Sequence, residues 1–353
     1  MTDDKIIEYI YMNLYIKNIL LIISVLFVII ILIQNYCKDN KKALIEILHP
    51  EWYKDVTKFP YNSFKCKINC DEYNIHIKNG FVKMKNTKII FSGLCINIEK
   101  NILNLKNRFE QLGSYFKDYK VIIFENDSID NTRNLLKKIC KENNNFHLIE
   151  CEDAINCKYN TLQAKEHGIF SDKRMQKMIK YRNILLNNIK KYYANYDVIC
   201  MTDLDISGPI NINGIAHSFG LYDRWDAISA YGINGITLTA GQPMYYDLIA
   251  YKDEKYDINK NLFDIIPISY IMYTKKIGDD IIKVKSAFAG LELIKMNVIM
   301  SGVDYTPLDN KYTCEHIIFH DNMINHNYNN IYINPNMIVL VGIQGNEKKL
   351  YVY

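Results

Sequence analysis

Short apolar runs alternate with stretches of helical periodicity between residues 88 and 205. The apolar runs predict buried strands at 88–93, 119–125, 146–150 and 196–205. Between them, apolar residues have the spacing of amphipathic helices at 101–116, 132–141 and 173–191. Strands separated by helices of this length predict an α/β domain built on a parallel sheet.

A longer apolar stretch lies near the N-terminus. Residues 14–36 reach the roughly 20 residues needed to cross a bilayer. No convincing small-residue cleavage site follows, which favours a retained single-pass anchor over a cleaved signal peptide. The unbroken part of this run is 19–33; Lys5 and Lys17 precede it, and Lys38, Lys41 and Lys42 follow it. This is a slight preference for a cytosolic main domain under the positive-inside rule, and the side of the membrane stays open.

These patterns divide the chain into four parts. We expect an N-terminal tail at 1–13, the anchor at 14–36, a stem or small extension at 37–87 and the main domain at 88–345. The stem is weakly periodic and is interrupted by prolines after His49 and Phe59.

Composition excludes some classes of function. The 353 residues are 49% hydrophobic and 23% charged, as in a globular protein with a sizeable core. A net charge of +4, dispersed along the chain, does not indicate a nucleic-acid partner.

The nine cysteines lack paired zinc spacing, so we expect most to be reduced and buried. Cys66 and Cys70 form either a local disulfide or half of a metal site.

The apolar run at 196–205 ends in two carboxylates, Asp203 and Asp205, that flank one leucine. Side-chain alternation along a strand sends both to the same side. Because two like charges so close repel each other, a divalent cation such as Mn²⁺ or Mg²⁺ is their natural partner. The alternative, and the commoner meaning of this motif alone, is a strand that ends in a solvated turn.

Polar residues also follow the other predicted strands. Ser92 and Gly93 end one strand, and Glu125 and Asp127 follow the next. In parallel sheets ligands bind beyond the carboxyl ends of strands, so these residues are candidates for binding a nucleotide. Capping of the next helix explains the nearby Ser128 and Asp130, but it leaves the carboxylates of Glu125 and Asp127 to accept hydrogen bonds from a base or ribose.

The predicted helix at 173–191 carries Arg174, Arg182 and Asn183. Solvated arginines are the default on an amphipathic helix. A planar guanidinium is also well suited to bind a diphosphate, which is the functional interpretation.

Taken in order, these motifs resemble the nucleotide-sugar glycosyltransferases of the GT-A type. More narrowly, they resemble the fungal capsule-associated mannosyltransferases and their relatives in large DNA viruses. Further segments that match in order are 225–232, 245–251, 286–290 and 314–320. The likeness covers roughly residues 88–340. Two departures, Ala289 in place of a glycine and Tyr231 in place of an asparagine, leave the identity of the sugar in doubt.

The resemblance implies a GT-A fold, a mixed and mostly parallel sheet flanked by helices. It also implies transfer of a hexose, with mannose as the first guess, from a nucleotide-sugar donor to a glycan or glycolipid acceptor, with retention. Asp203 and Asp205 would hold Mn²⁺ or Mg²⁺, and His320, or else His316, would be a further metal ligand. Glu315 would be the catalytic acid residue, as a base or as a stabiliser of positive charge. Gly290 would let the backbone approach the donor sugar.

Two other classes of function stay open. One is a catalytically silent glycan-binding or scaffold protein that has kept the fold. The other is a nucleotidyltransferase, which also uses paired acids and a metal. Such an enzyme normally has a glycine-rich phosphate loop after the first strand, and the segment 92–95 is not one.

Overall fold

The computed structural model describes residues 50–151, 172–234, 244–255, 275–309 and 312–342. All of them belong to one compact unit that begins at His49. The predicted anchor at 14–36 lies outside the described residues. Within the described ranges, every helix is too short or too polar to span a bilayer.

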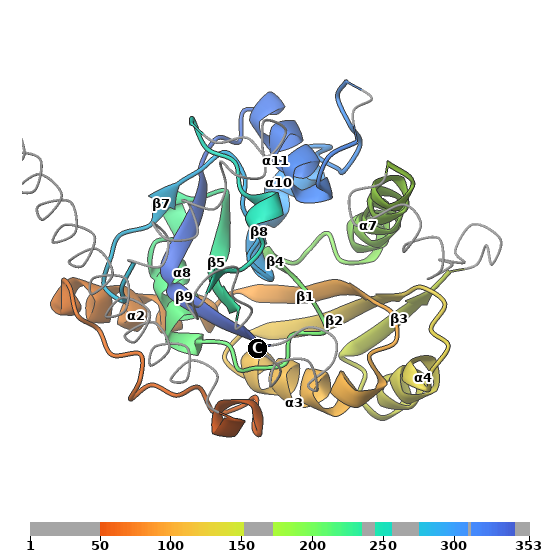
Figure 1. Cartoon of the computed structure of the whole chain (residues 1–353), viewed down its shortest axis with the longest axis horizontal. Coiled ribbons are helices and arrows are strands. Elements are labelled where there is room, and N and C mark those ends of the chain that lie inside the picture. Colours follow the sequence, from red (N-terminus) through yellow and green to blue (C-terminus); the bar gives the residue numbers. More distant parts are fainter. Residues whose placement is uncertain (1–49, 152–171, 235–243, 256–274, 310–311, 343–353) are drawn as a thin grey trace, which may run out of the picture. The chain divides into compact units, whose positions relative to one another are not determined.

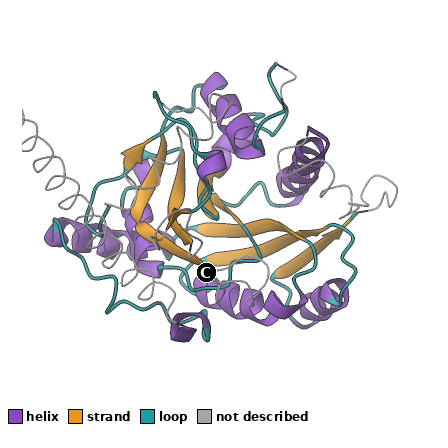
Figure 2. Cartoon of the chain, viewed as in Figure 1, coloured by secondary structure: helices purple, strands orange, loops and turns teal. Residues whose placement is uncertain are grey.

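Helices and strands alternate through the first half of the unit (Figures 1 and 2). The helices are α2 (Cys70–Met84), α3 (Ile102–Gly113), α4 (Thr132–Glu142), α7 (Asp172–Tyr192), α8 (Ile212–Gly220), α10 (Met296–Met300) and α11 (Glu315–Asn325). The strands are β1 (Lys88–Cys95), β2 (Asp118–Glu125), β3 (Phe146–Glu150), β4 (Val198–Thr202), β5 (Ala227–Asn234), β6 (Met244–Tyr245), β7 (Ile282–Lys283), β8 (Leu291–Lys295) and β9 (Ile331–Gly342). Short 3₁₀ turns are η1 (Pro50–Tyr53), η2 (Glu99–Asn101), η3 (Tyr222–Arg224) and η4 (Leu248–Ala250).

The nine strands of the described residues form one sheet in the order β3-β2-β1-β4-β8-β5-β9-β7, with β6 paired to β5. Strands β1 to β4 run parallel, and β5 and β9 are parallel to each other. Strand β8 lies antiparallel between β4 and β5, and β6 and β7 pair antiparallel with β5 and β9. Six of these nine strands therefore point the same way, which confirms a mixed, mostly parallel sheet.

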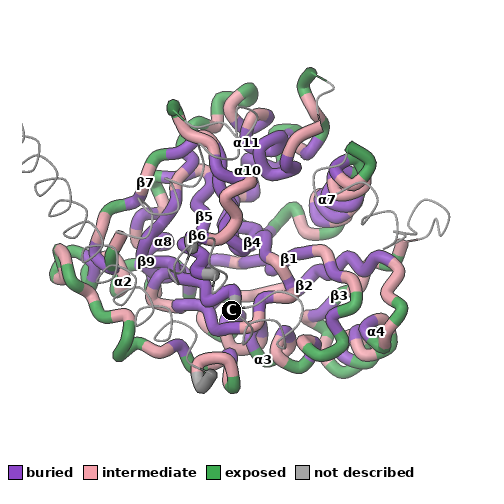
Figure 3. Tube along the Cα trace, viewed as in Figure 1, coloured by how far each residue is buried: buried purple, intermediate pink, exposed green. Residues whose placement is uncertain are grey.

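Helices cover both faces of the parallel half of the sheet. Helices α3 and α4 lie on one face and α7 on the other (Figure 1). Phe91 of β1 stacks on Phe109 of α3, and Phe124 of β2 stacks on Tyr181 of α7, each pair with ring centroids 5.1 Å apart. Because both faces are covered, these strands are apolar along nearly their whole length, and Figure 3 shows them buried.

Part of the expected stem is helical. Helix α2 packs against α8 at two close backbone approaches. A Cβ added to Gly80 would lie 1.7 Å from the Ala216 carbonyl oxygen, and one added to Gly220 would lie 2.1 Å from that of His76. Only glycine lets the two helix backbones approach this closely. Helix α2 is therefore part of the compact unit, which begins before the expected domain boundary at 88.

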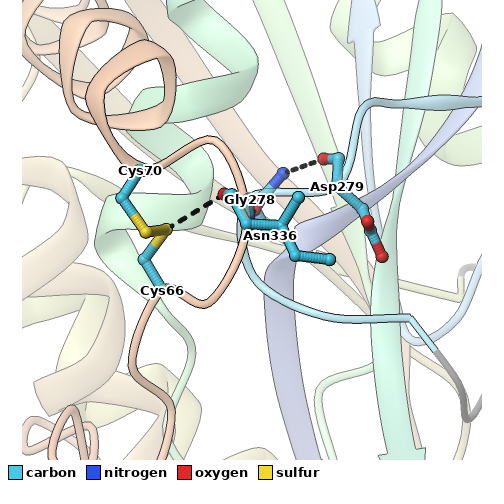
Figure 4. The surroundings of a disulfide bond; sticks show 6 residues. Cys66, Cys70, Gly278, Asp279 and Asn336 are labelled. Atoms are coloured by element: carbon cyan, nitrogen blue, oxygen red, sulfur yellow. Dashed lines mark hydrogen bonds between the residues drawn. A yellow bond between two sulfur atoms is a disulfide. The ribbon is translucent and has the colours of Figure 1, made fainter.

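A disulfide joins Cys66 to Cys70, the first residue of α2 (Figure 4). Of the two alternatives for this pair, the structure shows the disulfide. The neighbouring turn is held by Asn336, whose Oδ1 accepts from the Gly278 amide at 2.6 Å and whose Nδ2 donates to the Asp279 carbonyl at 2.9 Å. Cys151 is also disulfide-bonded. The free thiols of the described residues are those of Cys95, Cys140, Cys200 and Cys314.

Candidate active site

A cleft of about 220 Å³ lies at the carboxyl ends of β1, β2 and β4, with α7 along one side. Its lining consists of Leu94, Cys95, Ile96, Ile98, Asn126, Arg174, Lys177, Met178, Tyr181, Arg182, Asp203 and Asp205. Four predicted site residues, two arginines and two aspartates, therefore share one cleft. Its place in the sheet is where ligands bind in open α/β folds.

Asp203 directly follows β4 and is fixed at two points. Its backbone amide donates to the Gly290 carbonyl at 3.0 Å, and its Oδ2 accepts from the Tyr246 hydroxyl at 3.0 Å. Burial and the charge of Asp205 raise the pKa of Asp203 to about 7. Burial also raises the pKa of Asp205, against the opposing effect of Arg108. Ionising both carboxyl groups without a bound cation is therefore unfavourable, as the sequence predicts.

This donor set fits a hard divalent cation. Mn²⁺ or Mg²⁺ is commonly held by one or two carboxylates, with substrate phosphates and waters as the other ligands. Here Asp203 and Asp205 would be those carboxylates. Among the described residues, no three His, Cys, Asp or Glu side chains form a ready-made metal site.

The structure does not bring His320 to the two aspartates. Its ring is fully buried between β8 and the loop that precedes it. Nε2 lies 2.7 Å from Glu292 Oε1, and Nδ1 lies 3.0 Å from the Ser286 hydroxyl. Because both ring nitrogens have internal partners, His320 ties α11 to β8 in this structure and offers no nitrogen to a metal in the cleft.

Arg182 is the buried cation of the cleft. Its side chain is 3% exposed, and Nη2 lies 3.5 Å from Glu315 Oε1 and 3.3 Å from His316 Nε2. Burial opposes its charge, but the neighbouring acids Tyr305, Glu315 and Asp203 raise its pKa above the ordinary value. Its Nε and Nη1 have no hydrogen-bond partner among the described residues. A buried guanidinium with unused donors in a cleft is a binding group for an anion.

His316, the alternative metal ligand, faces Arg182. Burial and the Arg182 charge lower the pKa of His316 well below its usual range, so the ring is neutral. A guanidinium can only donate, so Nε2 accepts and the proton sits on Nδ1. The ring stacks on Phe288 with centroids 3.7 Å apart. In this arrangement His316 orients Arg182.

The cleft side of α7 follows from helical periodicity. Residues three, four and seven positions apart share one face of a helix, which brings Lys177 and Tyr181 beside the two arginines, Arg174 and Arg182. Asn183, one step further round, does not line the cleft. Its Oδ1 accepts from the Tyr305 amide at 2.9 Å, so it holds the segment before α11.

The remaining predicted donor-binding residues are engaged within the fold. The Ser92 hydroxyl donates to the Ile122 carbonyl of β2 at 3.0 Å. Glu125 is fully buried and accepts from the Ser128 amide and from Arg133 Nε, at 2.5 and 2.7 Å. Asp127 adopts φ 66° and lies 3.6 Å from Arg133. Arg133 thus pairs with both of the acids that the sequence assigned to the nucleotide, and neither acid is among the residues that line the described cleft.

Two predicted glycines have clear steric roles. A Cβ on Gly93 would lie 2.2 Å from the Thr202 carbonyl oxygen, so glycine lets β1 approach the end of β4. Gly290 adopts φ 81°, and its carbonyl accepts from Asp203 and from the Thr202 hydroxyl. Ala289 before it also has a positive φ, 55°. The family glycine expected there would adopt this conformation at lower cost.

Sequence reasoning missed Tyr246 and Asp247 as individual site residues. Tyr246 bonds Asp203, and Asp247 has the left-handed backbone conformation, with φ 68°. Burial, with the charges of Asp203 and Glu315, raises the pKa of Asp247 well above its usual range. Neither the bond from Tyr246 to Asp203 nor this backbone conformation can be inferred from the sequence.

Comparisons with known proteins give a fold-level likeness only. No family model and no curated protein matches the chain. A structure of TarS residues 1–349 from S. aureus is 15% identical, covers 71% of this chain and 59% of its own, and has a TM-score of 0.40. Its complex with UDP-GlcNAc has a TM-score of 0.41 at 15% identity, covering 74% and 60%. A mannosyltransferase from Pyrobaculum calidifontis, in complex with GDP-Man and Mn²⁺, is 9% identical, covers 80% and 67%, and scores 0.43.

This chain therefore spans less than two thirds of the length of the TarS structures. Identities and TM-scores this low establish neither a family nor an activity.

Proposed function

We propose that this chain is a metal-dependent glycosyltransferase that moves a hexose from a nucleoside-diphosphate sugar to a glycan or glycolipid acceptor. One observation carries the proposal. Arg182 is buried in the same cleft as Asp203 and Asp205, and two of its donor groups have no hydrogen-bond partner within the part of the chain that the structure describes. A diphosphate satisfies both needs at once, because it accepts from the guanidinium and supplies the remaining ligands of a divalent ion.

The metal ion, Mn²⁺ or Mg²⁺, would stabilise the charge on the departing diphosphate as a Lewis acid. Asp203 and Asp205 would hold it, with Tyr246 and the Gly290 carbonyl orienting Asp203. Arg182 would bind the diphosphate from α7, and Arg174 and Lys177 on the same helix face add positive charge to the cleft wall.

Glu315 would act beside the diphosphate, and not where the base or ribose of the nucleotide binds. It begins α11, is 6% exposed and lies next to Arg182. From there its carboxylate holds the guanidinium in place, and it can stabilise positive charge on the sugar or accept the acceptor proton. Mannose as the sugar and retention as the stereochemical outcome rest on the family resemblance alone.

The proposal extends to a single-pass membrane anchor at 14–36. The disulfide between Cys66 and Cys70 and the bonded state of Cys151 favour an oxidising compartment for the main domain. This opposes the slight preference for the cytosol that the flanking lysines indicate, and we give the disulfides more weight. The main domain would then lie on the lumenal side of the membrane, the placement that the resemblance to anchored sugar transferases of the Golgi or ER implies.

A donor screen on the full chain in detergent tests the proposed function. UDP-glucose, UDP-GlcNAc, GDP-mannose and nucleoside triphosphates are each supplied with and without Mn²⁺, and release of nucleoside diphosphate and of pyrophosphate is measured. We expect Mn²⁺-dependent release of nucleoside diphosphate from one sugar donor. Pyrophosphate release from a triphosphate would instead indicate a nucleotidyltransferase. Neither release nor binding of any nucleotide would indicate a protein that has kept only the fold.

A further inference from the structure

Arg108 on α3 is a second buried cation close to the aspartate pair. It is 2% exposed, and its Nη2 donates to two carbonyl oxygens, those of Ile206 at 2.7 Å and Gly208 at 2.9 Å. Both carbonyls belong to the loop that directly follows Asp205. The charge of Arg108 acts on Asp205 and favours its ionised form.

The loop at 205–208 is fixed from two sides. On the α3 side, Asn101 Nδ2 donates to the Asp205 carbonyl at 3.2 Å, next to the two bonds from Arg108. On the sheet side, the amides of Ser207 and Gly208 donate to carbonyls of β9 at 3.1 and 3.0 Å. The backbone that carries Asp205 therefore has little freedom, and three of its carbonyl groups accept hydrogen bonds from Asn101 and Arg108.

Packing alone does not account for an arginine at this place. A guanidinium removed from water is costly unless nearby acceptors and charges compensate it. The Nε of Arg108 has no hydrogen-bond partner among the described residues. Phe109 and Leu112, its buried neighbours on α3, are apolar, as the covered side of a core helix requires. The compensation comes from the loop carbonyls and from the charge of Asp205.

We propose that Arg108 is a positioning residue of the metal site. By donating from Nη2 to the carbonyls of both Ile206 and Gly208, it fixes the orientation in which Asp205 meets the cation, and its positive charge favours the ionised carboxylate. This inference rests on the proposed function, because it concerns the divalent ion that Asp203 and Asp205 would hold.

The test measures Mn²⁺ binding to the full chain in detergent with UDP or GDP present, by the electron paramagnetic resonance of free Mn²⁺. The variant Arg108→Met roughly keeps the side-chain length and removes both the charge and the two hydrogen bonds from Nη2. Outer-shell partners of metal ligands typically contribute about 10- to 100-fold to metal affinity, so we expect a loss of about tenfold or more. Arg108→Lys keeps the charge, but its ammonium ends one bond short of the Nη2 position and cannot reach both carbonyls as closely, so we expect a smaller loss.

The control is Phe109→Leu, which destabilises α3 without touching the loop. It should lower the melting temperature and leave Mn²⁺ affinity within about twofold, since it removes no outer-shell partner. Wild-type Mn²⁺ affinity in Arg108→Met overturns the inference. If that variant does not fold, wild-type affinity in Arg108→Lys overturns it. A wild-type protein that binds no Mn²⁺ with either nucleotide refutes the proposed function itself, and is seen before any variant is made.

Discussion

The Nη2 atom of Arg182 lies 3.5 Å from Oε1 of Glu315, and both side chains are nearly buried. The contact joins α7 to the first residue of α11 across 133 positions of sequence. Two residues that the sequence placed in separate roles, one for the diphosphate and one for catalysis, thus form one electrostatic unit. A change in either is expected to alter the other.

Glu315→Gln tests this coupling, because it removes the charge at nearly constant shape. Loss of one partner of a buried pair leaves the other uncompensated, so we expect the free energy of unfolding to fall by on the order of 3 kcal/mol. A bound diphosphate would return a negative charge to Arg182. Added nucleotide should therefore raise the melting temperature more in the variant than in the wild type.

Glu110→Gln on the outer side of α3 is the matched control, and its nucleotide-induced shift should equal that of the wild type. A Glu315→Gln protein with wild-type stability and a wild-type shift would show that the two residues are not coupled.

Arg182→Lys is not expected to behave as a conservative change. An ammonium cannot reproduce the planar fork, and a hydrogen bond to a charged group contributes about 1.5–3 kcal/mol. The dissociation constant for nucleoside diphosphate should rise by about tenfold or more, as measured by calorimetry. Lys180→Ala, on the exposed side of the same helix, should leave it unchanged. Equal affinity in the wild type and in Arg182→Lys would remove Arg182 from the donor site.

The first half of the fold could be predicted from sequence because its signals are local. The run ending at Thr202 is apolar because β4 is covered on both faces, and the helix at 173–191 differs from α7 by one residue at each end. The pattern also placed Asp203, Asp205, Arg174 and Arg182 together, since strand ends and one helix face are all that the cleft needs.

Long-range partners could not be predicted. Nothing local to Glu125 indicates that Arg133 will neutralise it, and nothing local to His320 indicates that Glu292 and Ser286 will take both of its nitrogens. In the sequence Arg108 has the pattern of an ordinary helix arginine, and only the fold brings the loop after Asp205 into contact with it. Such pairings arise from packing between distant segments, which periodicity does not encode.

Stability should depend on pH through His217, a buried residue of α8. Burial and the nearby His76 lower the pKa of His217 to about 4, and its Nδ1 accepts from Asn334 at 3.2 Å, as only a neutral ring can. Between about pH 6.5 and pH 4 the unfolded chain binds this proton and the folded chain does not. The contribution of His217 to the free energy of unfolding should therefore fall with decreasing pH across this window, by on the order of 3 kcal/mol in total.

Urea unfolding from pH 7 to pH 4 measures this dependence. His217→Gln should remove the His217 contribution, so that its free energy of unfolding falls less than that of the wild type as pH decreases, and the exposed His326→Gln should behave as the wild type does. An equal slope in the wild type and in His217→Gln would contradict the assignment.

The disulfide before α2 should contribute modestly to stability, because it closes a short loop. Chain-entropy estimates for a loop of this length give about 2 kcal/mol. The double variant Cys66→Ser, Cys70→Ser should lose about that much in urea unfolding. Cys140→Ser, which removes a free thiol, should lose less. Wild-type stability of the double variant would mean that the pair is not bonded in the folded protein.

Calorimetric titration of UDP and GDP, with and without Mn²⁺, tests the shared metal and diphosphate site most directly. The wild-type chain should bind one of the two tightly only when Mn²⁺ is present, and Asp205→Asn should lose this dependence while remaining folded. Asp197→Asn, the same change at the opposite end of β4, should bind as the wild type does. Unchanged Mn²⁺-dependent affinity in Asp205→Asn would contradict the metal site, and with it the proposed function.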